Sequence, residues 1–260
     1  MKIVVCVKQV PNTADVKIDP NTGTMIREGV ESIINPDDLG GLEAALRIKD
    51  QTEAEVIALS MGPKQADKAL RECLAMGADK AILLSDRAFA GADTWVTSLV
   101  LSKAISLVHP DLIIAGRQAI DGDTAQVGPQ IAEHLDVPSV AYVSKIRTNK
   151  DQLVVRREFE DRYQSVRVHM PCLLTVVKEI NTPRYMRVNK IFDAFKDGLV
   201  EVWDNMTLKI NSDQLGLKGS PTKVKKSYTK GVKSAGKVFD VSANEAVQII
   251  IDKLKENYIL

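Results

Sequence analysis

The 260-residue sequence has few of the residues that usually mark a catalytic or metal site. It contains three cysteines and three histidines. Cys6, Cys73 and Cys172 lie far apart, and neither the cysteines nor the histidines show the short spacing of metal ligands. Scattered cysteines in an odd number also argue against a disulfide framework. We therefore expect reduced, mostly buried thiols and a cytoplasmic protein.

Several recurrent catalytic motifs are also missing. The chain has no Gly-x-Gly-x-x-Gly after an expected strand, no Walker A loop and no Gly-x-Ser-x-Gly turn. His109, which precedes Pro110, is expected at a helix end, and His134 on the surface of a helix. If the protein performs redox chemistry, a bound cofactor must supply it.

The net charge and the short apolar runs give no reason to expect nucleic acid or a membrane as partner. The formal net charge is +1, so no global charge favours nucleic acid or an anionic membrane as partner. No segment approaches the roughly 18 consecutive apolar residues of a membrane span. A hydrophobic fraction of 45% is ordinary for a globular protein, and 260 residues are enough for a full α/β core.

Strand-like and helix-like segments alternate through the first half of the chain. Apolar runs at residues 3–7, 56–59, 80–84 and 112–115 are typical of strands buried on both faces. The alternation predicts a doubly wound parallel sheet in a three-layer α/β/α arrangement. Further strand-like segments predict a hairpin at residues 16–27 and added strands at one edge, at 140–146, 153–159, 165–169 and 173–177.

The clearest sign of a ligand site lies at residues 111–128. An apolar strand stops at Gly116 and gives way to small, acidic and amide residues, at the strand end where such sheets bind ligands. Gly116 and Gly122 allow the backbone to approach a ligand closely, and a helix expected from Thr124 can point its amides at an anion. A nucleotide phosphate fits this chemistry. An ordinary polar turn before a helix capped by Asp123 or Thr124 is the alternative.

This loop, Gly116-Arg-Gln-Ala-Ile-Asp-Gly-Asp-Thr-Ala-Gln126, resembles the signature loop of electron-transfer flavoprotein β subunits. The resemblance extends, in the family's order, to residues 2–10, 34–37, 61–63, 74–79 and 182–185. It implies an adenine-nucleotide α-hydrolase-like fold, a nucleotide bound by this chain and a heterodimer with an α subunit. The nucleotide is AMP in ordinary members of the family and a second FAD in electron-bifurcating members.

Carried over residue by residue, the resemblance places the cofactor at the ends of several strands. Cys6 and Met61 would meet the adenine, with core packing as the alternative. Arg117 would contact phosphate or a flavin ring, whereas Asp121 and Asp123 would meet ribose hydroxyls, cap a helix or order the loop. The expected set is Cys6, Asn35, Pro36, Asp37, Asp38, Met61, Gly91, Asp93, Thr94, Gly116, Arg117, Gln118, Ala119, Ile120, Asp121, Gly122, Asp123, Thr124, Ala125, Gln126 and Val127.

The segment at residues 89–94 favours FAD over AMP. It is small and glycine-containing, and it is similar to the segment of bifurcating β subunits that borders the flavin ring and the NADH site. Amides of the helix that opens near Asp93 would face the pyrophosphate, and a helix cap after a flexible loop is the alternative.

The resemblance to bifurcating members implies a complete electron path. FAD on this chain accepts a hydride from NADH, and electrons pass to ferredoxin or flavodoxin and, through the α-subunit FAD, to an acyl-CoA dehydrogenase or similar flavoenzyme. Two alternatives remain. One is an ordinary carrier with structural AMP, and the other is a nucleotide-sensing module of the universal-stress type.

The last part of the chain has a different character. We expect residues 1–190 to form the nucleotide-binding domain and residues 191–260 an arm that ends in an amphipathic helix, with Ile249, Ile250 and Leu254 on its apolar face. In the resembling family this region wraps around the α subunit, and packing on its own domain is the alternative. Val188 occupies the position of the family's apolar anchor for dehydrogenase partners.

Overall fold

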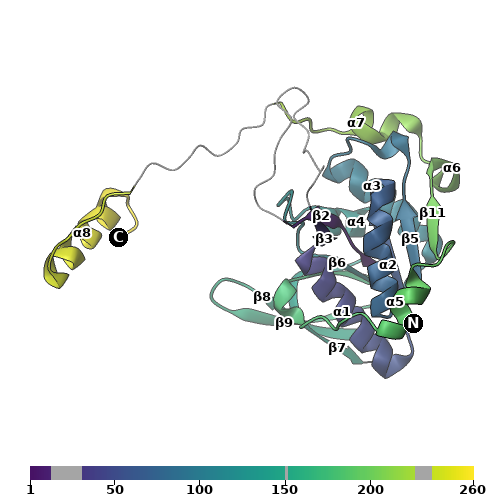
Figure 1. Cartoon of the computed structure of the whole chain (residues 1–260), viewed down its shortest axis with the longest axis horizontal. Coiled ribbons are helices and arrows are strands. Elements are labelled where there is room, and N and C mark those ends of the chain that lie inside the picture. The colour runs from purple at the N-terminus through teal and green to yellow at the C-terminus, as the bar shows by residue number, and fades with distance from the viewer. Residues whose placement is uncertain (13–30, 150–151, 226–235) are drawn as a thin grey trace. The chain divides into compact units, whose positions relative to one another are not determined.

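The computed structural model describes residues 1–12, 31–149, 152–225 and 236–260. They belong to two compact units, Met1–Lys225 and Lys226–Leu260 (Figure 1). The hairpin expected at residues 16–27 lies outside the described residues. None of the helices in the described part of the chain is long and apolar enough to cross a membrane.

A nine-stranded sheet forms the centre of the first unit. From β11 to β7 each strand is parallel to its neighbours, whereas β8 and β9 pair antiparallel at one edge. The predicted doubly wound α/β sheet is thereby confirmed. In spatial order the strands are β11 (Val200–Trp203), β5 (Lys80–Leu84), β4 (Glu55–Met61), β1 (Lys2–Cys6), β6 (Leu112–Gly116), β10 (Cys172–Val176), β7 (Ser139–Asn149), β8 (Gln152–Glu158) and β9 (Tyr163–His169).

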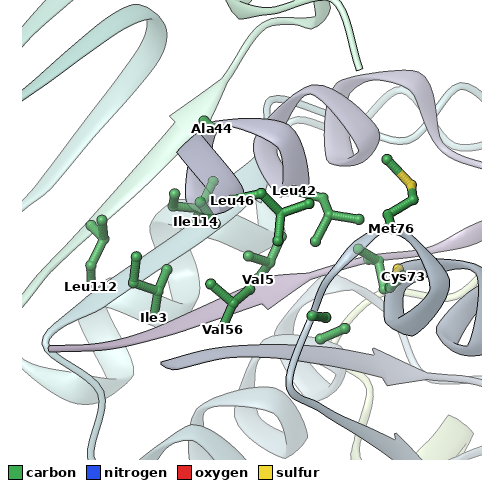
Figure 2. Packing of buried hydrophobic residues seen from close by; sticks show 14 of the residues in the cluster. Ile3, Val5, Leu42, Ala44, Leu46, Val56, Cys73, Met76, Leu112 and Ile114 are labelled. Carbon is green, nitrogen blue, oxygen red and sulfur yellow. The ribbon is translucent and has the colours of Figure 1, made fainter. Parts of the chain in front are cut away.

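Helices cover both faces of this sheet because its central strands alternate apolar side chains between them. On one face, Ile3 and Val5 of β1 pack with Leu42 of α1 (Pro36–Thr52) and with α2 (Asp67–Met76), as Figure 2 shows for part of this cluster. On the other face, Val4 and Cys6 pack with α3 (Thr94–Val108) and α4 (Val127–Leu135). Full burial of each such aliphatic side chain stabilises the fold by about 1.5–3 kcal/mol.

Two features of the first unit, one in the sheet and one in a helix, differ from the sequence expectation. Strand β10 lies between β6 and β7 instead of at the edge, and only β7, β8 and β9 extend the sheet beyond it. Helix α4 begins at Val127 and not at Thr124, because Asp123 and Ala125 adopt left-handed backbone with φ of 49° and 52°. A small second sheet pairs β2 (Gln9–Pro11) with β3 (Ser32–Ile34).

The cysteines and histidines lie largely where the sequence suggested. Cys6, Cys73 and Cys172 are buried free thiols. His109 ends α3 in the left-handed conformation, as expected for a helix end. His134 is half-buried on α4, where its ring lies 4.6 Å from that of Trp95.

The first unit continues well past residue 190, because the segment that follows returns to the sheet. Helix α5 (Val188–Ala194) packs on α2, and β11 then pairs with β5. Residues up to Lys225 belong to this unit, so its end differs from the predicted boundary at residue 190. The remaining short elements are α6 (Asn205–Leu208), α7 (Gly216–Gly219), η1 (Lys64–Ala66), η2 (Arg87–Phe89), η3 (Lys178–Ile180) and η4 (Ser212–Gln214).

The second unit contains the helix that the sequence predicted. Helix α8 (Ala243–Glu256) begins at a capping box, in which the Ser242 amide donates to Glu245 Oε2 at 3.0 Å. Ile249, Ile250 and Leu254 all lie on this helix, and Ile250 is 58% exposed. None of the α8 residues is buried within the described part of the chain.

Candidate functional site

A cavity of about 950 Å³ lies at the carboxyl ends of the central parallel strands. The ends of β1, β4, β5 and β6 contribute Cys6, Met61, Leu84 and Gly116 to its wall. This is where parallel α/β sheets bind ligands, because loops and helix N-termini diverge there. Its volume is at the upper end of the roughly 300–1,000 Å³ usual for small-molecule sites.

Most of the residues expected at a cofactor line this cavity. The lining includes Cys6, Asp38, Met61, Gly91, Asp93, Thr94, Gly116, Arg117, Gln118, Ala119, Gly122, Thr124, Ala125, Gln126 and Val127. The expected residues that do not line it are Asn35, Pro36, Asp37, Ile120, Asp121 and Asp123.

Several lining residues were not predicted from the sequence. Lys8, Pro63 and Arg87 follow the ends of β1, β4 and β5, so a uniform strand-end rule would have included them. Thr222 also lines the cavity, but it comes from a distant part of the chain that no local pattern connects to the site.

The Asn35 side chain holds the loop after β6 through two hydrogen bonds. The Asn35 side chain is fully buried, donates from Nδ2 to the Gln118 carbonyl at 2.8 Å and accepts at Oδ1 from the Ile120 amide at 3.1 Å. Asn35 is the N-cap residue of α1, with Pro36 following it in the first turn, but its side chain makes no cap hydrogen bond. Its amide therefore orders the loop instead of the helix.

Two acidic residues of the same loop also make internal contacts. Asp121, whose side chain is 7% exposed, pairs with Lys8 Nζ at 2.7 Å. Asp123 accepts from Gln118 Nε2 at 2.8 Å. Both carboxylates therefore have a partner within the protein that can help to order the loop.

Asp37 and Asp38, in the first turn of α1, join the ends of neighbouring strands. Asp38 accepts from the Lys8 amide at 2.8 Å and from the Gly116 amide at 3.0 Å. Asp37 accepts from the Lys178 amide at 3.0 Å, and Arg117 Nε lies 3.3 Å from its second oxygen. These contacts hold the strand ends in register beneath the cavity.

Burial controls the ionisation of this part of the site. It raises the pKa of Asp38 to about 7, although hydrogen bonds from Asn35 and the Lys8 and Gly116 amides oppose the shift. Burial, with a contribution from Asp38, raises the pKa of Cys6 to about 12, so this thiol is protonated at neutral pH.

Two helix N-termini converge on the cavity. Thr94 Oγ1 at the start of α3 donates to Gln126 Oε1 before α4 at 2.9 Å. The amides at such ends carry partial positive charge and can bind phosphate. Asp93 caps α3 by accepting from the Val96 amide at 3.1 Å, and its other oxygen accepts from the Thr222 amide at 2.9 Å, so both oxygens are occupied within the protein.

The charged side chains in the lining also suit an anionic ligand. Lys8, Lys64, Arg87 and Arg117 line the cavity. Asp86, an acid of the lining, accepts from the Ala88 and Asn205 amides at 2.9 and 3.0 Å. Among the described residues, no group of three or more His, Cys, Asp or Glu side chains is placed to hold a metal ion. The arrangement fits a phosphorylated nucleotide.

Val188 lies away from this cavity. It is the first residue of α5 and is 75% exposed. Tyr185 and Phe192 nearby are also exposed. The segment therefore presents large apolar side chains on the surface of the first unit.

Comparison with known proteins agrees with this architecture. The electron transfer flavoprotein domain matches residues 22–205. The chain is 57% identical over 258 residues to the electron transfer flavoprotein subunit beta of Clostridium acetobutylicum, covering 99% of each chain. It is 52% identical over 263 residues to the caffeyl-CoA reductase-Etf complex subunit CarD of Acetobacterium woodii, covering 100% of both. It is 45% identical over 269 residues to the acryloyl-CoA reductase electron transfer subunit gamma of Anaerotignum propionicum, again covering 100% of both. The chain therefore belongs to the electron transfer flavoprotein family, among the β subunits that act in electron transfer.

Proposed function

We propose that this chain is the β subunit of a heterodimeric, electron-bifurcating electron-transfer flavoprotein and that its cavity holds FAD. The extent of the cavity carries the proposal. The lining runs from Cys6 and Met61, past the loop at residues 116–127, to the segment at residues 85–94. AMP corresponds to only the adenosine-phosphate half of FAD, so it would leave the end at residues 85–94 unused.

Each part of the lining has chemistry that suits one part of FAD. The strand ends at Cys6 and Met61 offer backbone and apolar contacts to adenine. The N-terminus of α4 and the left-handed residue Ala125 before it offer amides to the pyrophosphate. Gly91, with φ of 72°, allows the backbone at the flavin end of the lining to adopt a left-handed turn.

The protein contributes binding, orientation and exclusion of water. FAD itself supplies hydride acceptance from NADH and the division of the pair into single electrons. Asn35, Asp38 and Lys8 hold the loop and strand ends in place before any ligand binds, which lowers the cost of ordering them on binding.

The proposed partners follow from the family and from the relatives' names. The apolar face of α8 would dock on the α subunit. Ferredoxin or flavodoxin would take one electron. The segment with Val188 would dock on an acyl-CoA dehydrogenase or similar flavoenzyme, and two relatives are named after a caffeyl-CoA and an acryloyl-CoA reductase. The resemblance implies a lysine cluster in ordinary members where this chain has Phe192 and Phe195, and this departure favours a dedicated complex.

The nucleotide content of the co-expressed heterodimer tests this proposal. We expect acid release and chromatography to give two FAD per heterodimer, and NADH to bleach the flavin absorbance. One FAD with one AMP and no response to NADH would identify an ordinary carrier instead. Purification of this chain as a lone homodimer with bound nucleotide would support the universal-stress alternative.

A further inference from the structure

The segment that carries Val188 combines exposed apolar side chains with a tightly held backbone. Tyr185, Val188 and Phe192 are 96%, 75% and 79% exposed. In contrast, Ala194 on α5 is buried, and Ile191 packs against the core. One side of the segment is thus fixed to the protein, while the other presents large apolar groups to solvent.

Arg184 holds the start of this segment on α1. Its Nε donates to Glu43 Oε2 at 2.8 Å and its Nη2 donates to Asp50 Oδ2 at 2.7 Å. The Arg184 amide also donates to Glu43 Oε2, at 3.1 Å. Charge-assisted contacts to two carboxylates fix both the side chain and the backbone from which it projects.

Glu43 is built into the fold to receive this arginine. Its side chain is 3% exposed on α1. Burial alone would raise its pKa, but hydrogen bonds from Arg184 and Arg47 outweigh burial and lower the pKa below its ordinary value. A buried carboxylate of this kind needs its partner, so removal of Arg184 leaves a costly, poorly compensated charge.

Arg71 of α2 holds the other end of the segment. Its Nη1 donates to the carbonyls of Ala194 and Lys196 at 2.9 and 2.7 Å, where the last turn of α5 leaves carbonyls without helical partners. Asp67 pairs with the Arg71 side chain one helical turn away. The Arg187 amide adds a backbone contact to the Ala75 carbonyl at 3.0 Å.

We propose that Arg184 and Arg71 are positioning residues for docking of the flavin dehydrogenase, which rests on the proposed function of the Val188 segment. Their side chains are only 22% and 14% exposed, and their donors point into the protein, so they act through the segment they hold. A segment ordered in advance binds without the entropic cost of ordering its side chains. Loss of either arginine weakens docking by about tenfold, because one or two side chains of the segment must then be ordered on binding.

The test compares Arg184→Gln with Arg47→Gln in the purified heterodimer. Arg47 also pairs with Glu43, at 2.8 Å, but it reaches the segment only through a 3.5 Å contact with the Thr182 carbonyl. We expect Arg184→Gln to raise KM for an acyl-CoA dehydrogenase about tenfold. The rate at saturating dehydrogenase and the NADH-to-dye rate stay unchanged. The KM of Arg184→Lys, which keeps the charge but not the planar guanidinium group, should lie between the KM values of Arg184→Gln and Arg47→Gln.

Hydrogen exchange separates positioning from general destabilisation. We expect exchange at residues 185–196 to accelerate in Arg184→Gln by a larger factor than exchange in β1 and β6, which reports any general loss of stability, and to stay unchanged in Arg47→Gln. Unchanged exchange, or an unchanged KM despite faster exchange, overturns the inference. The KM comparison can use dithionite-reduced heterodimer, so an absent NADH reaction counts only against bifurcation. A wild-type heterodimer that reduces no acyl-CoA dehydrogenase contradicts both the proposed docking and this inference.

Discussion

Replacement of Gly116 by alanine is expected to empty the nucleotide site and to lower the free energy of unfolding by about 3 kcal/mol. A Cβ at this position would lie 2.1 Å from Asp38 Oδ1 and 2.9 Å from the Asp38 amide. These atoms belong to a buried carboxylate and to the backbone of α1, so the clash cannot be relieved by rotation of a flexible side chain. The Gly116 amide would also lose its 3.0 Å hydrogen bond to Asp38.

Gly122 in the same loop provides the matched control. A Cβ there would meet no protein atom within 4 Å, and Gly122 is not among the glycines with positive φ. Gly122→Ala should therefore keep the wild-type unfolding free energy, and any loss of nucleotide would report contact with the ligand. Chemical denaturation and acid-released nucleotide measure the two effects. Equal stability of the Gly116→Ala and Gly122→Ala heterodimers would contradict the prediction.

Gly116 also shows how far the sequence predicted the site. The abrupt end of an apolar strand placed a ligand loop at this residue, and the structure has a cavity there. The glycine was explained by close approach of a ligand, however, whereas the atoms nearest to its missing Cβ belong to Asp37 and Asp38. Local patterns locate strand ends, but they do not reveal which side chain from a distant helix occupies the space above them.

The role of Asn35 could not be predicted from the sequence for a related reason. Asparagine before proline at a helix start predicts a cap, and α1 does begin there. Its side chain instead bonds Gln118 and Ile120, which lie 83 and 85 residues further along the chain. Thr222 was missed because its hydrogen bonds to Asp93 span 129 residues. Such pairings are set by the packing of whole elements, so they cannot be predicted from hydrophobic periodicity or helix-capping rules.

The strands in the first half of the chain followed from residue type. Buried β-branched runs predicted β1, β4, β5 and β6, and apolar residues at helical spacing predicted the helices that cover them. The position of β10 beside β6, and of β11 beside β5, depends instead on crossovers from later segments. Strand content was predictable from residue type, whereas strand order for the last elements was not.

Replacement of Asp38 by asparagine should change how stability depends on pH. Asp38 titrates near its ordinary value, about 4, in the unfolded chain, but burial raises its pKa to about 7 in the folded protein. Between these values the unfolded chain binds fewer protons than the folded one, so stability falls as pH rises, and the loss is complete above pH 7. The substituted asparagine carries no charge, and its amide oxygen can accept from only one of the Lys8 and Gly116 amides. The cost of the substitution is therefore roughly independent of pH.

We expect the stability of Asp38→Asn relative to wild type to increase by about 2 kcal/mol between pH 5 and pH 7. Urea unfolding of both heterodimers at one fixed protein concentration measures this difference. Asp86→Asn is the control: hydrogen bonds from the Ala88 and Asn205 amides lower the pKa of Asp86, so it is ionised throughout this range in both states. Infrared spectra should also contain a protonated carboxyl band that disappears near pH 7 and is absent from Asp38→Asn. A difference between wild type and Asp38→Asn that does not vary with pH would mean that the two amides keep Asp38 ionised despite its burial.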